Sequence, residues 1–338
     1  MKILFLFIAV FLSSSFAIAQ NVYDVTPRTK NGDNEVDTTL TKEELFIKDN
    51  FPTILTADWV KGMRFMFEIE PDKYSVFPLS LYNPNNDEAI SSKKLSPFDY
   101  EGKIFTIVNT ESRAIDCPIG ECLSTCIIFD CEGVRFEFCY PGSQDEMRRD
   151  NDAVLLNGLT YLDEVDKAKR LLLNKELYIL TPHWRTVNEE GKIQGIEKKK
   201  FEKITITNVG VGSLRNPVRL VFEDEEGETY FIDIRFSNTN LREITSKVLI
   251  KHTRNSFVDK LAFDDPYQKY QNISPEIWSV IQQEKVQVGM TKQECELSWG
   301  KPESINETTT DFAVSEQWVF DTGSFLYFDN GILTTIHY

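Results

Sequence analysis

The sequence is poor in the runs and residue types that define several large classes of protein. Glycine (16) and proline (13) together make up less than a tenth of the 338 residues, which excludes collagen-like and low-complexity chains. After the N-terminus, no run comes close to the roughly 18 uncharged residues that a membrane-spanning helix needs. We therefore predict that the chain has no transmembrane segment.

Positive charge is also scarce. Lysine and arginine number 37 against 53 aspartates and glutamates, so the formal net charge is −16. A chain of this charge repels the phosphate groups of nucleic acids and anionic lipids. The composition therefore argues against nucleic acid as a partner.

Motifs of the common enzyme classes are missing. The chain contains no His-Glu-x-x-His, no Gly-x-Ser-x-Gly and no P-loop, and Gly210-Val211-Gly212 is only a fragment of a dinucleotide-binding loop. The acidic run at 223–227 lacks the alternating ligands of an EF-hand, which favours a charged turn. We predict no catalytic residue, cofactor or metal ligand. The 53 acidic residues leave open a carboxylate pair of the kind that glycosidases use.

The residues that are abundant indicate a folded protein. Hydrophobic residues make up 41% of the chain and aromatic residues 12%, which is enough for a substantial core. A length of 338 residues suits two or three domains.

The N-terminus has the pattern of a secretory signal peptide. Lys2 precedes an apolar run at 3–12, and Ala17-Ile18-Ala19 forms a small-residue cleavage site. We predict a signal peptide at 1–19 and a polar, flexible leader at 20–40. No cysteine follows the cleavage site, so no lipid anchor is expected. The mature protein is therefore predicted to be periplasmic or extracellular.

Five of the six cysteines lie between positions 117 and 139. In an oxidising compartment such a cluster is considered first as disulfides. A hairpin turning at Glu132-Gly133 would place Cys126 opposite Cys139, and Cys117 and Cys122 flank a short loop that a second bridge could close. Buried free thiols are an equal alternative. Zinc is less favoured, because the paired Cys-x2-Cys spacing is missing.

The region before residue 274 is predicted to be mainly β, as tandem small barrels or meanders. We place one β-rich unit at 41–158, a helix and a second β-rich unit at 159–253, and a linker at 254–273. Thr160 and Asp163 can cap a helix whose apolar residues recur at three- and four-residue steps from Leu162 to Leu172.

A faint internal repeat is consistent with these tandem units. Residues 100–107 compare with 173–180, and the hairpin around 127–136 compares with that around 220–230. Residues 59–69 form a third, more degenerate start. Ordinary meanders can also generate such similarity.

The C-terminal segment, 274–338, has the clearest helix signals. Ser274 and Pro275 begin one helix, and Thr291 with Glu294 forms a capping box for a second that Gly300 ends before Pro302. Alternating strands follow to residue 337, with a turn at 329–331. The order predicts two helices and then an antiparallel sheet of three or four strands.

Several motifs of this segment resemble a known domain. They are Gly289-Met290-Thr291-Lys292, Gly300-Lys301-Pro302, Glu316-Gln317-Trp318-Val319-Phe320, Leu326-Tyr327-Phe328-Asp329-Asn330-Gly331 and Leu333-Thr334. Together they resemble the SmpA/OmlA (BamE) domain over about 65 residues. The resemblance implies two helices on a small antiparallel sheet, a fold shared with the beta-lactamase inhibitory protein, and a non-catalytic module that serves outer-membrane protein assembly. The chain differs in lacking the lipidation cysteine and in carrying about 250 residues ahead of the module.

We therefore predict a non-catalytic binding or scaffolding protein of the Gram-negative envelope, with an envelope or secreted protein as its partner. Structural roles are expected for six motif residues: Gly289, Thr291, Gly300, Pro302, Trp318 and Tyr327. Exposed aromatic residues on the sheet are the first candidates for binding. The alternatives are a secreted hydrolase of polysaccharide or peptide and an inhibitor-like protein. His183 and Trp184 could line a ligand pocket, although such pairs more often anchor a loop.

Overall fold

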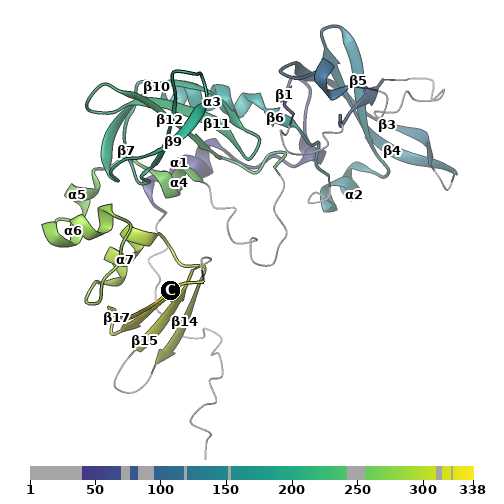
Figure 1. Cartoon of the computed structure of the whole chain (residues 1–338). Coiled ribbons are helices and arrows are strands. Elements are labelled where there is room, and N and C mark those ends of the chain that lie inside the picture. Colours follow the sequence, from purple (N-terminus) through teal and green to yellow (C-terminus); the bar gives the residue numbers. More distant parts are fainter. Residues whose placement is uncertain are drawn as a thin grey trace, which may run out of the picture. The chain divides into compact units, whose positions relative to one another are not determined.

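The computed structural model describes residues 40–69, 77–82, 95–117, 120–150, 154–241, 256–309, 314–320 and 323–338. The predicted signal peptide and almost all of the predicted leader lie outside these residues. Three antiparallel sheets of six, seven and four strands dominate the described chain, which confirms the mainly β prediction (Figure 1). None of the described helices is long and apolar enough to cross a membrane.

The first sheet has the strand order β2-β5-β4-β3-β1-β6. Its strands are β1 (Arg64–Phe67), β2 (Ser80–Leu81), β3 (Ile104–Cys117), β4 (Gly120–Cys131), β5 (Val134–Tyr140) and β6 (Leu159–Tyr161). Fully buried phenylalanines at alternating strand positions, including Phe65, Phe105 and Phe129, fill its core. The short helices η1 (Thr56–Asp58), η3 (Pro97–Asp99) and α2 (Gln144–Arg149) lie in the same part of the chain.

The second sheet has the order β13-β7-β10-β11-β12-β8-β9. Its strands are β7 (Glu176–Ile179), β8 (His183–Val187), β9 (Ile193–Glu197), β10 (Glu202–Ser213), β11 (Asn216–Glu223), β12 (Thr229–Ile234) and β13 (Leu261–Ala262). Helix α3 (Leu162–Leu172) packs Val165, Ala168 and Leu172 into the core of this sheet. Its N-cap is Tyr161, not Thr160 or Asp163: Thr160 belongs to β6 and its hydroxyl donates to Glu68.

Two predicted boundaries are wrong. The predicted first β-rich unit includes helix α1 (Lys42–Asn50), but Phe46 of this helix packs against Phe257 and Phe263 in the core of the second sheet. The predicted linker includes α4 (Ser256–Lys260) and β13, which belong to that same sheet and core, and α5 (Pro266–Lys269). Polar composition concealed these elements, because only isolated apolar residues such as Phe257 and Leu261 are buried.

The two sheets are copies of one arrangement. Each strand of the first sheet has a counterpart in the second at the same place in the strand order. Across the sheet, β2 matches β8, β5 matches β12, β4 matches β11, β3 matches β10, β1 matches β7 and β6 matches β13. A bulge interrupts β3 between Ile107 and Asn109, and an equivalent bulge interrupts β10 between Ile206 and Asn208. We call residues 56–161 the first repeat and 162–262 the second repeat.

Turn hydrogen bonds repeat with the strands. The amide of Gly62, at φ +95°, donates to Ile107 over 2.8 Å, and that of Asn174, at φ +62°, donates to Ile206 over 2.8 Å. The hairpin part of the predicted repeat is confirmed, because Phe129 pairs with Phe136 as Phe222 pairs with Tyr230. The other half of the predicted repeat is out of register. Residues 173–180 match the segment around Gly62, the expected third start, and not residues 100–107.

The third sheet belongs to the C-terminal module, residues 274–338. It has the order β14-β15-β16-β17 and follows two helices, as predicted. The elements are α6 (Pro275–Gln282), α7 (Lys292–Trp299), β14 (Ser304–Thr309), β15 (Val314–Val319), β16 (Phe325–Asp329) and β17 (Ile332–His337). Ser274 caps α6, and the capping box of Thr291 and Glu294 begins α7, which confirms both predicted starts.

Candidate functional site: the open face of the C-terminal sheet

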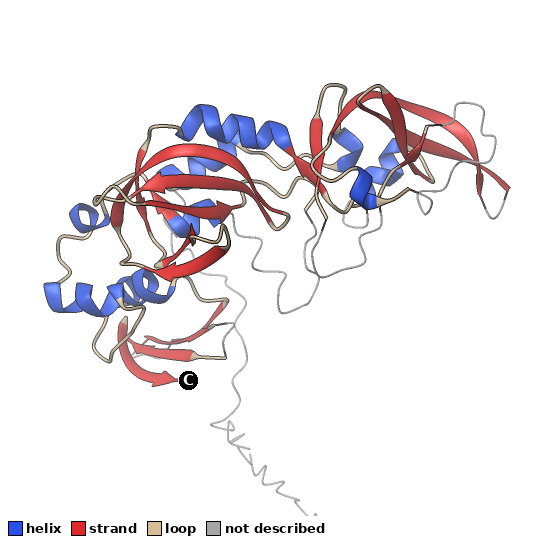
Figure 2. Cartoon of the chain, turned by 45° about the horizontal axis from the view of Figure 1, so that its top comes forward, coloured by secondary structure: helices blue, strands red, loops and turns tan. Residues whose placement is uncertain are grey.

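One face of the third sheet carries the core of the module. Trp318, Leu326, Phe328 and Leu333 point to this face and are buried with residues of α6 and α7. Figure 2 shows the two helices on one side of the sheet. The sheet therefore has a covered face and an opposite face, which we call the open face.

The six motif residues divide between shaping the fold and facing outward. Gly289 (φ +97°) donates its amide to Leu333 over 2.8 Å and so ties the loop after α6 to β17. Gly300 ends α7 at φ +81° and ψ −175°, a conformation that essentially only glycine adopts. Pro302 is buried beyond this stop. Thr291 caps α7, and Trp318 fills the core.

Tyr327 lies on the open face, in a row of side chains that crosses all four strands. The strand register aligns Asn306, Gln317, Tyr327 and Thr335. The Asn306 amide donates to Gln317 over 3.0 Å, and the Gln317 amide donates to the Tyr327 hydroxyl over 2.9 Å. These bonds fix the side chains before any ligand arrives, which lowers the entropic cost of binding.

The rest of the open face is also uncharged except at one position. The outward side chains are Ser304, Asn306, Thr308, Ser315, Gln317, Val319, Phe325, Tyr327, Asp329, Ile332, Thr335 and His337, and none is buried. Asp329 alone carries a formal charge, and its carboxylate accepts a 2.8 Å bond from Ser315. Phe325 and His337 lie together with ring centroids 6.1 Å apart.

The module's charges lie elsewhere. Residues 274–338 contain ten acidic residues and three lysines, so the module is strongly acidic around a face that carries a single charge. On the covered side, the buried Glu316 pairs with Lys292 of α7 and accepts a 3.0 Å bond from the Trp318 indole. Glu316 thus holds α7 against β15. Burial raises the pKa of the nearby Cys295 thiol to about 12, so this cysteine is a packing residue.

The module is anchored to the second repeat by two neighbouring residues. Phe201 is only 3% exposed and packs edge-on against Trp278 of α6 at 5.3 Å. The ammonium of Lys200 donates to the carbonyls of Leu297 and Ser298, at 3.0 and 2.9 Å, and so caps the C-terminal end of α7. Burial lowers the pKa of Lys200.

The structure separates His183 from Trp184. They are neighbours on β8 and point to opposite faces, so Trp184 is buried and donates its indole N–H to Thr181 over 2.8 Å. His183 is exposed and lies 3.4 Å from Glu284 of the module. The two side chains do not line one pocket, and the interpretation as a loop anchor holds for Trp184.

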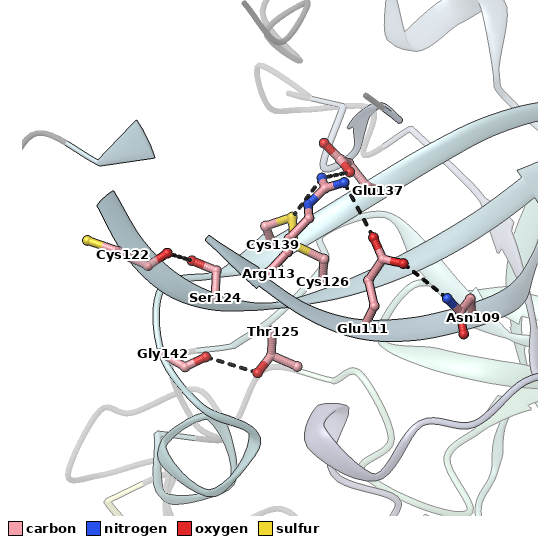
Figure 3. Close-up of a disulfide and its surroundings, with 10 residues drawn as sticks. All are labelled: Asn109, Glu111, Arg113, Cys122, Ser124, Thr125, Cys126, Glu137, Cys139 and Gly142. Atoms are coloured by element: carbon pink, nitrogen blue, oxygen red, sulfur yellow. Dashed lines mark hydrogen bonds and ion pairs between the residues drawn. A yellow bond between two sulfur atoms is a disulfide. The ribbon is translucent and has the colours of Figure 1, made fainter. Parts of the chain in front are cut away.

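The predicted disulfide between Cys126 and Cys139 is present as a cross-strand bridge between β4 and β5 (Figure 3). Arg113 lies beside it, paired with Glu137 and Glu111 and stacked on Tyr82 at 5.3 Å. The second predicted bridge is wrong at Cys122, which is a free thiol opposite Ile115. The side chain of Cys117 lies outside the described residues. No cluster suited to a metal ion occurs in the part of the chain that the structure describes.

Sequence reasoning assigned no role to Asn306, Gln317, Lys200 or Phe201. The alternation of Trp318 with Gln317 in β15 could have assigned Gln317 to the face opposite the core. Nothing in the local pattern around Lys200 and Phe201 indicates that they are buried, because their partners are almost 80 residues or more away.

Comparisons of the chain with protein-family models, with curated protein sequences and with solved structures found no match. The SmpA/OmlA (BamE) resemblance of the module therefore stays a prediction.

Proposed function

We propose that this chain is exported through the signal peptide at residues 1–19 and acts, in the periplasm or outside the cell, as a non-catalytic binding protein. Its C-terminal module binds an envelope or secreted protein through the open face of the third sheet. The Cys126–Cys139 disulfide supports export, because such bridges persist in oxidising compartments.

The observation that carries the proposal is the character of the open face. Protein interfaces are depleted of charge at their centres and enriched in aromatic residues, and tyrosine with asparagine and serine is the usual composition of adaptable binding surfaces. The open face has this composition in a chain of net charge −16. Its hydrogen-bonded row from Asn306 to Tyr327 supplies a pre-ordered centre.

The order of two helices and a four-stranded antiparallel sheet is the order that the SmpA/OmlA (BamE) resemblance implies. It supports a binding module of that kind, whereas fold likeness alone does not transfer a partner. We propose envelope scaffolding as the setting in which the open face is used.

The proposal is tested by crosslinking the tagged full-length protein in intact cells and identifying captured proteins by mass spectrometry. Three forms are compared: wild type, Tyr327→Lys and Phe98→Lys. Phe98 is the matched control, because it is an aromatic residue 76% exposed in the first repeat, whereas Tyr327 is 37% exposed on the open face. We expect specific proteins that Tyr327→Lys loses and Phe98→Lys retains. Equal capture by all three forms would contradict a role for the open face.

A further inference from the structure

Strand β14 forms one edge of the third sheet and is unusually accessible. It lies at the end of the strand order, and every residue after Ser304 is exposed. Within the described residues, β14 pairs only with β15. An edge strand of this kind presents a row of backbone N–H and C=O groups that another strand can pair with.

The other described sheet edges are short, covered or protected. Strands β2 and β13 have two residues each and β6 has three. The edge strand β9 contains Gly195 at its centre and is flanked by the exposed Lys192 and Lys199, which discourage pairing.

At the far edge of the third sheet, the segment 289–292 covers the start of β17. Gly289 donates to Leu333, and Leu333 donates to Met290, both over 2.8 Å. Strand β14 has six residues and contains no lysine, proline or glycine. Among the described sheet edges, β14 is therefore a long edge strand that is protected neither by lysine, proline or glycine nor by a covering segment.

Charge indicates what can pair with this edge. The exposed Glu307 lies in the middle of β14, and the module carries ten acidic residues against three lysines. Antiparallel pairing of β14 with β14 of a second copy would bring the two Glu307 side chains close together, and like charges in opposed strands are destabilising. The charge favours a strand that carries lysine or arginine.

We propose that an extended segment of the partner protein, bearing lysine or arginine, adds to β14 as a fifth strand of the third sheet. The added strand would lie beside Asn306 and Thr308, so its alternate side chains would extend the open face. This inference rests on the proposed binding function and names the partner's conformation and charge.

A synthetic peptide provides the probe. Strand β15 already pairs with β14, so its sequence Val314–Phe320 is a known complement. The probe is that heptapeptide with lysine in place of glutamate at the position of Glu316, and the controls have glutamate or proline there. Each is added to the full-length protein, and amide hydrogen exchange is followed across the chain.

We expect the lysine peptide to slow exchange in residues 304–309 by about tenfold or more at saturation, as new backbone bonds form. At low salt it should bind at least about threefold more tightly than the glutamate peptide, and salt should reduce this difference. The proline peptide should not protect β14. Protection confined to other segments would overturn the proposal.

One variant makes the test specific to the edge. Neighbouring strand residues direct their N–H groups to opposite edges. Val314 of β15 and Phe320 just after it bond toward β16, so Gln317 bonds toward its partner Asn306 in β14. The N–H of Ile305 therefore faces the free edge, and Ile305→Pro removes that donor and leaves the pairing with β15 intact. Hydrogen exchange in residues 315–319 checks that the variant remains folded. That variant should lose peptide binding, and wild-type binding by it would overturn the proposal.

The cellular crosslinking separates the two proposals. If capture depends on Tyr327 but survives the folded β14 proline variant, the module binds through its open face and strand addition is wrong. If capture requires neither, the proposed binding function itself fails.

Discussion

The two repeats solve the same structural problem with different chemistry. At equivalent positions of the same hairpin, the first repeat has the Cys126–Cys139 disulfide and the second has the ion pair of Arg219 with Asp233, joined over 2.8 and 3.0 Å. Both link neighbouring strands at a directly opposed pair. The strand pairing, and not the nature of the cross-link, is what the two repeats share.

A second difference shows what the C-terminal module adds. The turn before β3 contains Gly102 at φ +75°, and the equivalent turn before β10 contains Phe201 at φ +67°. The amide of Gly102 donates to the carbonyl of Phe67, and the amide of Phe201 donates to the carbonyl of Ile179, so equivalent hydrogen bonds close the two turns. A bulky residue is strained in this region of φ, and burial of its ring against Trp278 offsets that strain. Docking of the module therefore explains why the second repeat has phenylalanine at the position where the first repeat has glycine.

The largest expected effect comes from this turn. Phe201→Ala removes a buried ring from the module core, and we expect it to lower the free energy of unfolding by about 4 kcal/mol. Gly102→Ala, which only adds strain at an exposed turn, should cost about 1 kcal/mol. Urea denaturation measures both. Equal costs would show that Phe201 does not anchor the module.

The two cross-links should differ in what their removal costs. Replacing both Cys126 and Cys139 with serine should lower the free energy of unfolding by about 3 kcal/mol, because the unfolded chain gains freedom. Replacing Arg219 with Met and Asp233 with Leu should change it by about 1 kcal/mol or less. An ion pair and apolar residues of similar volume are often equivalent, and Arg185, the second partner of Asp233, is half exposed to water. Hydrogen exchange resolved by repeat measures each effect. A larger loss from the ion-pair replacement would reverse this comparison.

The smallest effect is a pH dependence at Lys200, whose equivalent in the first repeat is the exposed Glu101. Burial lowers the pKa of Lys200 in the folded protein below its ordinary value of 10.5. Between the lowered pKa and 10.5 the unfolded chain binds more protons, so the contribution of Lys200 to stability rises with pH in that window. Stability curves of wild type and Lys200→Met should therefore differ in slope below pH 10.5. Parallel curves would mean that Lys200 keeps its ordinary pKa.

Local signals predicted the elements better than their packing. The capping box placed α7 correctly, and hairpin spacing identified Cys126 opposite Cys139, because these features depend on residues close in sequence. Helix α1 was assigned to the wrong repeat because its partners Phe257 and Phe263 lie more than 200 residues away. The predicted register of the repeat was wrong for a related reason. The true register is apparent only from the strand pairing, in which Ile107 and Ile206 hold equivalent positions beside the bulges.

The candidate site was predicted in part. The motif residues and the strands of the module were identified from the sequence, and Tyr327 was among them. Its row with Asn306 and Gln317 depends on cross-strand register, which the sequence does not show. The open face became apparent only when α6 and α7 were placed on one side of the sheet (Figure 2).

Site-specific photo-crosslinking in intact cells tests the central claim most directly. A benzophenone amino acid is placed in turn at Tyr327 on the open face and at Phe98 in the first repeat, in the full-length protein. The account predicts a discrete adduct with one or a few envelope or secreted proteins from position 327 and none of these from position 98. The same adducts from both positions, or none from position 327, would contradict binding through the open face.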